Sequence, residues 1–185
     1  MKLAVKPRTG EKKGDVQQIR REGDIPAVLY SSQDPARKIT VNGAEFRAVL
    51  RNLKMGQLPT TLFHLSDGKQ EWKAVVKDIQ YDLTSYTVSH LDFEVVHTGS
   101  PVRVKVPVEC VGIVDCVGVK LGGFLRQIAR HVKVECLPEE IPSHFQIDVR
   151  EMGIRQSKRL KDIVMPKGVR PLASQEDVLV VIAKR

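Results

Sequence analysis

The alternation of apolar and polar residues in the first half of the chain predicts β-strands. The clearest case is residues 86–96. Side chains two residues apart on a strand share a face. The apolar members of this alternation are therefore expected to face a core, and they are Leu91, Phe93 and Val95. The polar members are expected on the opposite face: Tyr86, His90, Asp92 and Glu94. This polar face could be solvated, or it could hold His90 and Asp92 towards a ligand.

The same pattern predicts five further strands and two helices before residue 97. The strands are residues 2–6, 25–30, 38–41, 61–65 and 70–77. The helices are residues 16–22, which Asp15 can cap, and residues 44–53, before which Asn42-Gly43 either forms a turn or caps the helix. Ile79 should be inside but falls out of the alternation of its strand, so we expect a bulge near Lys77-Asp78.

The pattern changes at residues 97–101, a short polar stretch of turn-forming residues that is typical of a domain boundary. We therefore expect two domains, residues 1–96 and 97–185. The second half predicts strands at residues 102–108, 132–137, 145–149 and 177–183, with residues 117–121 short and extended. Residues 124–130 fit a helical turn or a strand, and residues 157–162 fit a short helix or a loop. The predicted fold class is mainly β with a few short helices.

Composition and charge narrow the class of partner. Hydrophobic residues make up 42% of the 185 residues and charged residues 28%, which is normal for a soluble globular protein. The formal net charge is +8 and the pI is about 9.5. This balance favours a polyanionic partner, with nucleic acid ahead of an anionic membrane, although a soluble protein can also simply be basic.

The three cysteines, Cys110, Cys116 and Cys136, form no CxxC spacing, so neither a disulfide framework nor a zinc site is expected. Free thiols fit a reducing cytoplasm. The first residues lack the apolar stretch of a signal peptide, and no run approaches the roughly 18 apolar residues of a membrane span. We therefore expect a cytoplasmic protein with no membrane contact, no metal and no cofactor.

Catalytic motifs are weak. His90 and Asp92 share a strand face, but no serine or cysteine stands at a nucleophile motif, and the five histidines form no HExxH pattern. Gly118, Gly122 and Gly123 make neither GxGxxG nor a phosphate loop. The chain is therefore not expected to be an enzyme, and a hydrolase that uses His90 and Asp92 is the less favoured alternative.

Several features favour RNA binding. The basic loop and the helix that follows it carry Arg8, Lys12, Lys13, Arg20 and Arg21. Lysine and arginine supply affinity for phosphates. Asp92 would be repelled by phosphates, so it makes sense beside RNA only where it accepts hydrogen bonds from base amino groups or ribose 2′-hydroxyls, or orders His90 and nearby cations. The minor groove of A-form RNA displays such groups.

Three blocks in the first half resemble the large-subunit ribosomal proteins that bind 5S rRNA, the general stress protein CTC family. They are residues 20–30 (RREGDIPAVLY), 77–80 (KDIQ) and 90–93 (HLDF). The second half is similar to the additional domain of the longer members, with blocks at residues 118, 122–125, 134–138, 141–142 and 166–169 in family order. The resemblance covers nearly the whole chain.

The resemblance implies an N-terminal β-barrel domain that binds 5S rRNA through the minor groove, and a mostly β C-terminal domain. By matching positions it implies these RNA contacts: Arg8, Lys13, Arg20, Tyr30, Lys77, Gln80, His90 and Asp92. It further implies a place in the large (50S) ribosomal subunit, with neighbouring ribosomal proteins or 23S rRNA contacting the C-terminal domain. Off the ribosome we expect a monomer. A stress-induced RNA-binding protein that acts off the ribosome is the nearest alternative.

This chain departs from the family in two places. Members often carry Gly-Lys-Gly-Ala-Ser-Arg-Arg-Leu-Arg in the basic loop, where this chain has glutamine at 17 and 18 and a carboxylate at Asp15. The glycine usual after the tyrosine is Ser31. The second domain has a basic segment of its own, because residues 150–170 hold seven Lys and Arg against Glu151 and Asp162. That segment is either a solvated loop or a second contact with the ribosome.

Overall fold

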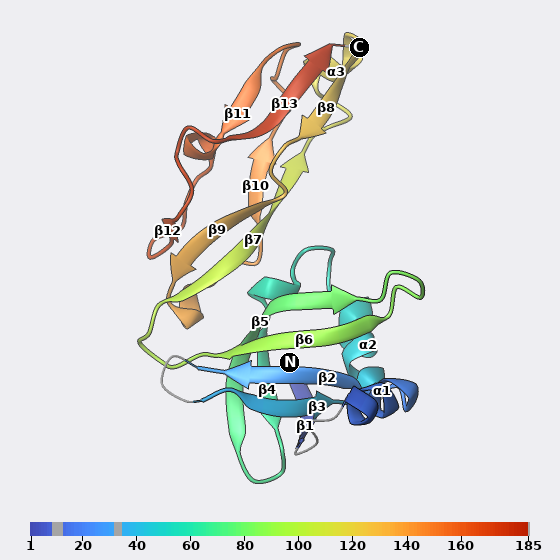
Figure 1. Ribbon diagram of the computed structural model, residues 1–185. Coiled ribbons are helices and arrows are strands. Elements are labelled where there is room, and N and C mark those ends of the chain that lie inside the picture. Colours follow the sequence, from blue (N-terminus) through green and yellow to red (C-terminus); the bar gives the residue numbers. More distant parts are fainter. Residues whose placement is uncertain (9–12, 32–34, 185) are drawn as a thin grey trace. The chain divides into compact units, whose positions relative to one another are not determined.

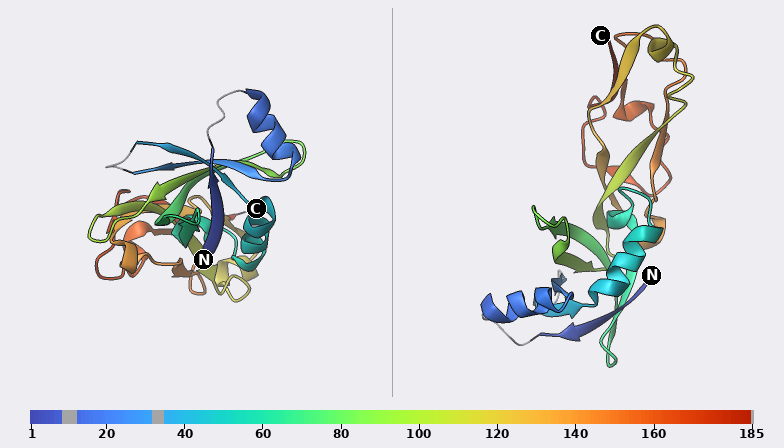
Figure 2. Two further views of the ribbon diagram at one scale, coloured as in Figure 1. Left: turned by 90° about the horizontal axis from the view of Figure 1, so that it is seen from below. Right: turned by 90° about the vertical axis from the view of Figure 1, so that its right-hand side faces the viewer.

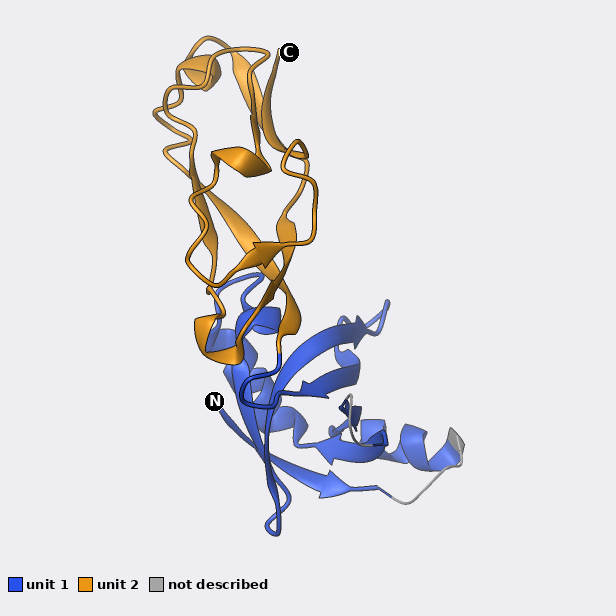
Figure 3. Ribbon diagram, turned by 90° about the vertical axis from the view of Figure 1, so that its left-hand side faces the viewer, with its two compact units in different colours: residues 1–100 blue, residues 101–185 orange. Residues whose placement is uncertain are grey.

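The computed structural model describes residues 1–8, 13–31 and 35–184. The chain divides into two compact units, residues 1–100 and 101–185 (Figure 3). Both are mostly β, as the sequence predicts, and each is described by itself. Among the described residues, none of the helices has the length and apolar character that crossing a membrane would require.

Unit 1 is a closed six-stranded barrel (Figure 1). Its strands are β1 (Lys2–Pro7), β2 (Ile25–Tyr30), β3 (Arg37–Val41), β4 (Leu62–Ser66), β5 (Glu71–Tyr81) and β6 (Val88–Val95). Around the barrel the order is β1-β3-β2-β6-β5-β4, and the pair β1–β4 closes it. The pairs β1–β4 and β2–β6 are parallel and the others antiparallel. The N-terminal β-barrel that the family resemblance implies is therefore present.

Alternation along the strands fills the barrel. Leu91 and Phe93 of β6 are fully buried, as expected, and Val95 packs against the same core. The ring of Phe93 meets Phe63 edge to face at 6.0 Å, and Phe63 lies 6.4 Å from Phe46. Phe46 belongs to α2 (Gly43–Asn52), which lies against the barrel (Figures 1 and 2). Aromatic pairs of this kind add to the free energy gained by burying their area.

Of the two roles expected for Asn42-Gly43, the structure has the cap, because the Asn42 side-chain oxygen accepts hydrogen bonds from the N–H groups of Ala44 and Glu45 at 2.9 and 3.1 Å. The first helix, α1 (Lys13–Arg21), begins earlier than expected, and Asp15 lies in its first turn, where a carboxylate favours the helix dipole. Figure 2 shows α1 outside the barrel, at the edge of unit 1. Gly23, with φ of 87°, follows the helix.

The register of β5 against β6 shifts between Val76 and Asp78, which confirms the predicted bulge at Lys77. Val76 pairs with Phe93 on the inner face, and beyond the bulge Asp78 pairs with Asp92 on the outer face. One expectation for this hairpin is wrong. Tyr86 does not start β6, because it lies in the turn before it with φ of 54°, 81% exposed.

Unit 2 contains two small sheets. The first has the order β10-β7-β9-β12, made of β7 (Val102–Val111), β9 (His131–Cys136), β10 (Phe145–Asp148) and β12 (Arg170–Pro171). The second has the order β11-β13-β8, made of β8 (Gly123–Gln127), β11 (Ser157–Arg159) and β13 (Val178–Lys184). The inward valines of β7 and β9, with Leu179, Val180 and Ile182 of β13, form much of the buried core.

The structure shows the secondary structure of three segments of unit 2 for which the sequence pattern is wrong or ambiguous. Residues 117–121 are not extended: α3 (Val117–Lys120) is a short helix. Its Gly118 packs so closely that a Cβ there would lie 2.8 Å from Ile182 and 2.9 Å from the Met152 carbonyl, so this position of the helical turn requires a glycine. Residues 123–127 are a strand. Residues 157–159 form β11, followed by the 3-10 turn η3 (Leu160–Asp162). Two other 3-10 turns are η1 (Leu58–Thr60) and η2 (Pro138–Glu140).

Candidate nucleic-acid interface

The outer faces of β2, β6 and β5 bring together most of the predicted contact residues. We define the polar strand face as the outward side chains of these three strands together with Lys77 at the bulge. Its members are Tyr30, Lys77, Asp78, Gln80, His90, Asp92 and Glu94. The alternate residues of the same strands point into the barrel and form its core, so the core does not require the outward side chains.

His90 and Asp92 form the centre of the polar strand face. They stand two residues apart on β6, and His90 Nδ1 lies 2.8 Å from Asp92 Oδ1. Both are partly exposed, 22% and 34%. Because Nδ1 donates to the carboxylate, Nε2 is left for a ligand, as an acceptor in the neutral ring and as a donor in the protonated ring. The second oxygen of Asp92 remains an acceptor.

Gln80 and Asp78 flank this pair across the ladder. Gln80 pairs with His90 and Asp78 pairs with Asp92. Gln80 is exposed and offers both an amide donor and a carbonyl acceptor. Two carboxylates directly opposite each other destabilise a sheet. The bulge at Lys77 creates this Asp78–Asp92 pairing, so β5 and β6 hold directional hydrogen-bonding groups together in spite of that cost.

Tyr30 and Lys77 border the face near Glu94. Tyr30 ends β2 and pairs with Glu94, and Lys77 Nζ lies 2.6 Å from Glu94 Oε2. Partial burial raises the pKa of the Tyr30 hydroxyl above its ordinary value of 10.0, and the carboxylates of Glu94, Asp92 and Asp78 raise it further. Tyr30 therefore stays a neutral hydrogen-bond donor at physiological pH. Its ring is half-buried at the edge of the face.

Arg8 lies outside this face but in register with it, separated from β6 by β3 and β2. The N–H of Arg8 donates to the Lys38 carbonyl at 2.9 Å, Lys38 pairs with Val28, and Val28 pairs with Asp92. A single cross-strand row thus runs from Arg8 to Asp92, with cations at one end and carboxylates at the other. Arg8 Nε is buried without a hydrogen-bond partner among the described residues.

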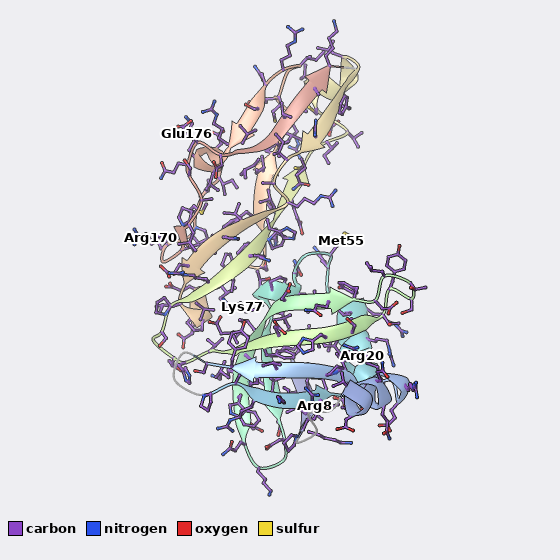
Figure 4. The ribbon with its side chains drawn as sticks, in the orientation of Figure 1. Arg8, Arg20, Met55, Lys77, Arg170 and Glu176 are labelled. Carbon is purple, nitrogen blue, oxygen red and sulfur yellow. The ribbon has the colours of Figure 1, made fainter. Side chains whose placement is uncertain are left out.

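Arg20 reaches the barrel from α1. Its Nε donates to the Ser89 carbonyl at 3.1 Å, beside His90. It borders a hollow of about 200 Å³, with Arg47, Asp24 and Asp82 among the other lining residues. Lys13 begins α1, but its side chain lies outside the described residues, as does Lys12. In Figure 4 the labelled Arg8, Arg20 and Lys77 come from the end of β1, from α1 and from β5.

The departures from the family pattern are accommodated locally. Ser31 Oγ lies 2.8 Å from His97 Nε2, which ties the end of β2 to the segment after β6. Gln18 donates from Nε2 to Glu22 Oε1 at 3.0 Å within α1. Neither contact involves a member of the polar strand face.

Three residues near the predicted contacts were not in the predicted set: Lys38, Asp78 and Glu94. The alternation already places Glu94 on this face, two residues beyond Asp92, but the family resemblance does not name it as a contact. Asp78 requires the position of the bulge. Lys38 requires the β2–β3 register, for which the sequence holds no direct signal.

The polar strand face has no catalytic arrangement. The one close pair that resembles a catalytic dyad, His90 with Asp92, has no serine or cysteine side chain hydrogen-bonded to it among the described residues. In that part of the chain no group of three or more His, Cys, Asp and Glu side chains is arranged to hold a metal ion. The face offers hydrogen-bond donors and acceptors in fixed positions, bordered by cations.

Comparison with known proteins gives the same division of the chain. The model of the Ribosomal L25p family matches residues 3–93, and that of the ribosomal protein TL5 C-terminal domain matches residues 101–185. A protein of Chlamydia trachomatis serovar L2 named large ribosomal subunit protein bL25 is 45% identical over 185 residues, all of both chains. Proteins of that name from Chlamydia muridarum and Chlamydia pneumoniae are each 42% identical over the full length of both chains. The chain therefore belongs to the ribosomal L25p family, which is a family of ribosomal proteins and not of enzymes.

Proposed function

We propose that this protein is a structural constituent of the large ribosomal subunit and binds 5S rRNA through the polar strand face of unit 1. The name of its relatives, large ribosomal subunit protein, supports the place in the subunit. That place implies a cytoplasmic protein. The observation that carries the choice of surface is the His90–Asp92 pair, held at 2.8 Å with Gln80 opposite on the neighbouring strand.

Binding in the minor groove follows from the chemistry of the face. Asp78, Asp92 and Glu94 would repel phosphates, so the centre of the face cannot lie against the RNA backbone. Carboxylate, amide, imidazole and phenol groups can instead exchange hydrogen bonds with ribose 2′-hydroxyls and base edges, which the wide minor groove of A-form RNA presents. Arg8 and Arg20 lie near the border of the face, where they can reach the phosphates on either side of the groove. Lys13 is proposed to join them from the start of α1.

The roles follow from position. His90 Nε2 and the second oxygen of Asp92 make directional contacts, Gln80 donates and accepts beside them, and the Tyr30 hydroxyl donates at the edge. Lys77 neutralises Glu94 at 2.6 Å and so lowers the repulsion that the RNA meets there. Phosphate contacts supply affinity, while the central groups select the groove and its bases.

The test measures the affinity of the full chain for 5S rRNA and for an unrelated structured RNA. His90→Ala and Asp92→Asn should each weaken 5S rRNA binding by about 1–3 kcal/mol. The matched controls are His64→Ala, on the outer side of β4, and Glu71→Gln, at the start of β5, which should bind like the wild type. Folded His90 and Asp92 variants with unchanged affinity would show that the face is not the site.

Sedimentation separates ribosomal from free function. The wild-type chain should travel with 50S particles after incubation with subunits depleted of their own family member. A chain that binds 5S rRNA but stays at the top of the gradient would support an RNA-binding role off the ribosome and contradict the place in the subunit.

A further inference from the structure

One end of unit 2 exposes a group of apolar side chains that its core does not use. We call this group the unit 2 tip: Ile113, Val114, Val117, Leu121 and Phe124. Val114 is 85% exposed, Leu121 68%, and the other three between 42% and 49%. Single exposed apolar residues are ordinary, but several within twelve residues of sequence on one rigid end mark an interaction surface.

The unit 2 tip is held firmly by its scaffold. Gly118 and Gly123 both approach Ile182 so closely that a Cβ on either would lie within 3.0 Å of its side chain. The N–H groups of Val117 and Gly118 donate to the carbonyls of Arg150 and Met152 at 3.0 and 2.8 Å. These contacts hold α3 against Ile182 of β13 and against residues 150–152. Figure 1 shows α3, the start of β8 and the end of β13 together beside the C-terminus.

The unit 2 tip also lies away from the linker. β7 starts at Val102, directly after the division between the units, and ends at Val111, directly before the tip. Ten extended residues span roughly 30 Å. The apolar side chains are therefore displayed at the end of unit 2 opposite to the point where the chain arrives from unit 1.

Cations outnumber carboxylates around the unit 2 tip, where five Lys and Arg residues stand against Asp115, Asp148 and Glu151. Lys120 pairs with Asp115 at 3.4 Å, and Arg150 lies 4.0 Å from Asp148. Three further cations have no side-chain partner among the described residues, and they are Arg126, Arg155 and Lys184. Arg126 shares the outer face of β8 with Phe124, Lys184 pairs with Gly123, and the Arg155 N–H donates to the Ile182 carbonyl. The backbones of all three lie on or next to residues 181–184 of β13.

We propose that the unit 2 tip docks onto another protein of the large ribosomal subunit, at a surface with an apolar depression bordered by carboxylates. In placing the partner in that subunit, the inference rests on the proposed function. Apolar area at the centre and unpaired cations at the border are the complement of such a surface. Burying the five side chains supplies the driving force, and the cations set the orientation.

Two other occupants fit the unit 2 tip less well. A second copy of the chain would meet it across a two-fold axis, which places Arg126, Arg155 and Lys184 of both copies near one another. RNA would leave aliphatic side chains such as Val114 and Leu121 against a polar backbone, because these side chains donate no hydrogen bonds and interfaces with nucleic acids are more polar than this.

The experiment uses the full chain and large subunits depleted of their own family member. Val114→Glu with Leu121→Glu should weaken binding to the subunits about tenfold or more, because it places carboxylates against the partner's carboxylates. The matched control is Val164→Glu with Leu137→Glu, two exposed apolar residues of unit 2 outside the tip, at 91% and 41%. Both double variants should bind protein-free 5S rRNA with wild-type affinity.

A second measurement avoids destabilising substitutions. A photoreactive benzoylphenylalanine in place of Phe124 keeps an apolar ring and should cross-link to a protein of the subunit, whereas the same group in place of Val164 should not. Cross-links to rRNA alone, cross-links between two copies of the chain, or equal subunit binding by both double variants would each overturn the inference. Failure of the wild-type chain to bind subunits is a different result, which overturns the proposed function and this partner together.

Discussion

Net charge alone would place the RNA-binding site on the more basic unit, but the polar strand face of unit 1 and the unit 2 tip suggest the opposite. Unit 1 has 15 Lys and Arg against 12 Asp and Glu, a net charge of +3, and unit 2 has 15 against 10, a net charge of +5. The proposed RNA site nevertheless lies on the less basic unit and includes three carboxylates, while the more basic unit ends in an apolar surface. Basic composition predicts a polyanionic partner for the chain, but the placement of directional groups locates the site.

The two surfaces are also built differently. On the polar strand face, strand register fixes each side chain, since His90, Asp92 and Glu94 each stand opposite a defined residue of β5. At the unit 2 tip, close contacts of Gly118 and Gly123 fix the backbone, and the apolar side chains are exposed to solvent. A site that selects hydrogen-bond partners needs the first kind of support, whereas a surface that buries apolar area can use the second.

The largest expected effect tests whether the two units fold independently. Phe93→Ala removes a fully buried ring from unit 1 and should destabilise that unit by about 3–5 kcal/mol. Leu179→Ala should destabilise unit 2 by about 2–5 kcal/mol. The chain carries its own probes, because the single tryptophan, Trp72, lies in unit 1 and all three cysteines lie in unit 2. Urea unfolding followed by Trp72 fluorescence and by thiol reactivity separates the units.

Burial makes the thiols a sensitive probe. It raises the pKa of Cys110 and Cys136, so fewer thiolates are available while unit 2 is folded. Phe93→Ala should shift the fluorescence transition alone and Leu179→Ala the thiol transition alone. Coincident shifts of both transitions in either variant would mean that the units unfold as one, and the proposed domains would have to be merged. The same logic predicts that residues 1–96 alone fold and bind 5S rRNA.

The sequence predicted most of the fold, because alternation and turn residues act locally. Leu91 and Phe93 are buried as their alternation requires, Asn42 caps α2, and the misplaced Ile79 located the bulge. The failures came where local pattern is ambiguous. The predicted alternation of β6 extends to Tyr86, which lies in a turn. Residues 117–121 are expected to be extended but form a helical turn, whose Gly118 packs against Ile182, 64 positions away in the sequence.

The candidate site was predicted only in part, for a related reason. His90 and Asp92 share a face by their spacing alone, and that arrangement is present at 2.8 Å. The row that links Arg8 to Asp92 crosses β3 and β2, and its order depends on the register of three strand pairs. The spacing of residues within one strand can be predicted from the sequence, whereas the register between strands depends on how the whole barrel packs.

A smaller effect, the salt dependence of 5S rRNA affinity, tests which unit supplies the cations that contact phosphates. If phosphates are contacted by cations of unit 1, the logarithm of 5S rRNA affinity should fall linearly with the logarithm of salt concentration. Arg20→Gln should then weaken binding and reduce the magnitude of that slope by about 1. Arg155→Gln in unit 2 removes the same charge and should leave the slope unchanged. A shallower slope for the Arg155 variant, or an unchanged slope for the Arg20 variant, would show that unit 2, and not unit 1, contacts the phosphates.

The smallest expected effect tests the spacing within the polar strand face. Tyr81→Phe with Tyr86→Phe leaves Tyr30 as the only tyrosine, so ultraviolet absorbance can follow its ionisation. Its pKa lies above the ordinary 10.0, chiefly because of burial and then because of Glu94, Asp92 and Asp78 in that order. Glu94→Gln should therefore lower the Tyr30 pKa more than Asp92→Asn, and Asp92→Asn more than Asp78→Asn. Burial keeps it above 10.0 in each variant.

The sign of the pH dependence follows from the same shift. Folding raises the pKa of Tyr30, so the folded state holds the phenol proton more tightly than the unfolded chain does. The stability of unit 1 that depends on Tyr30 is then complete below pH 10 and is lost as the pH rises through the higher folded-state pKa. Trp72 fluorescence in urea between pH 9 and 11 measures this loss, which Glu94→Gln should diminish. An unchanged Tyr30 pKa in the Glu94 variant would show that β2 and β6 do not hold these two side chains together. Tyr30 would then not belong to the polar strand face.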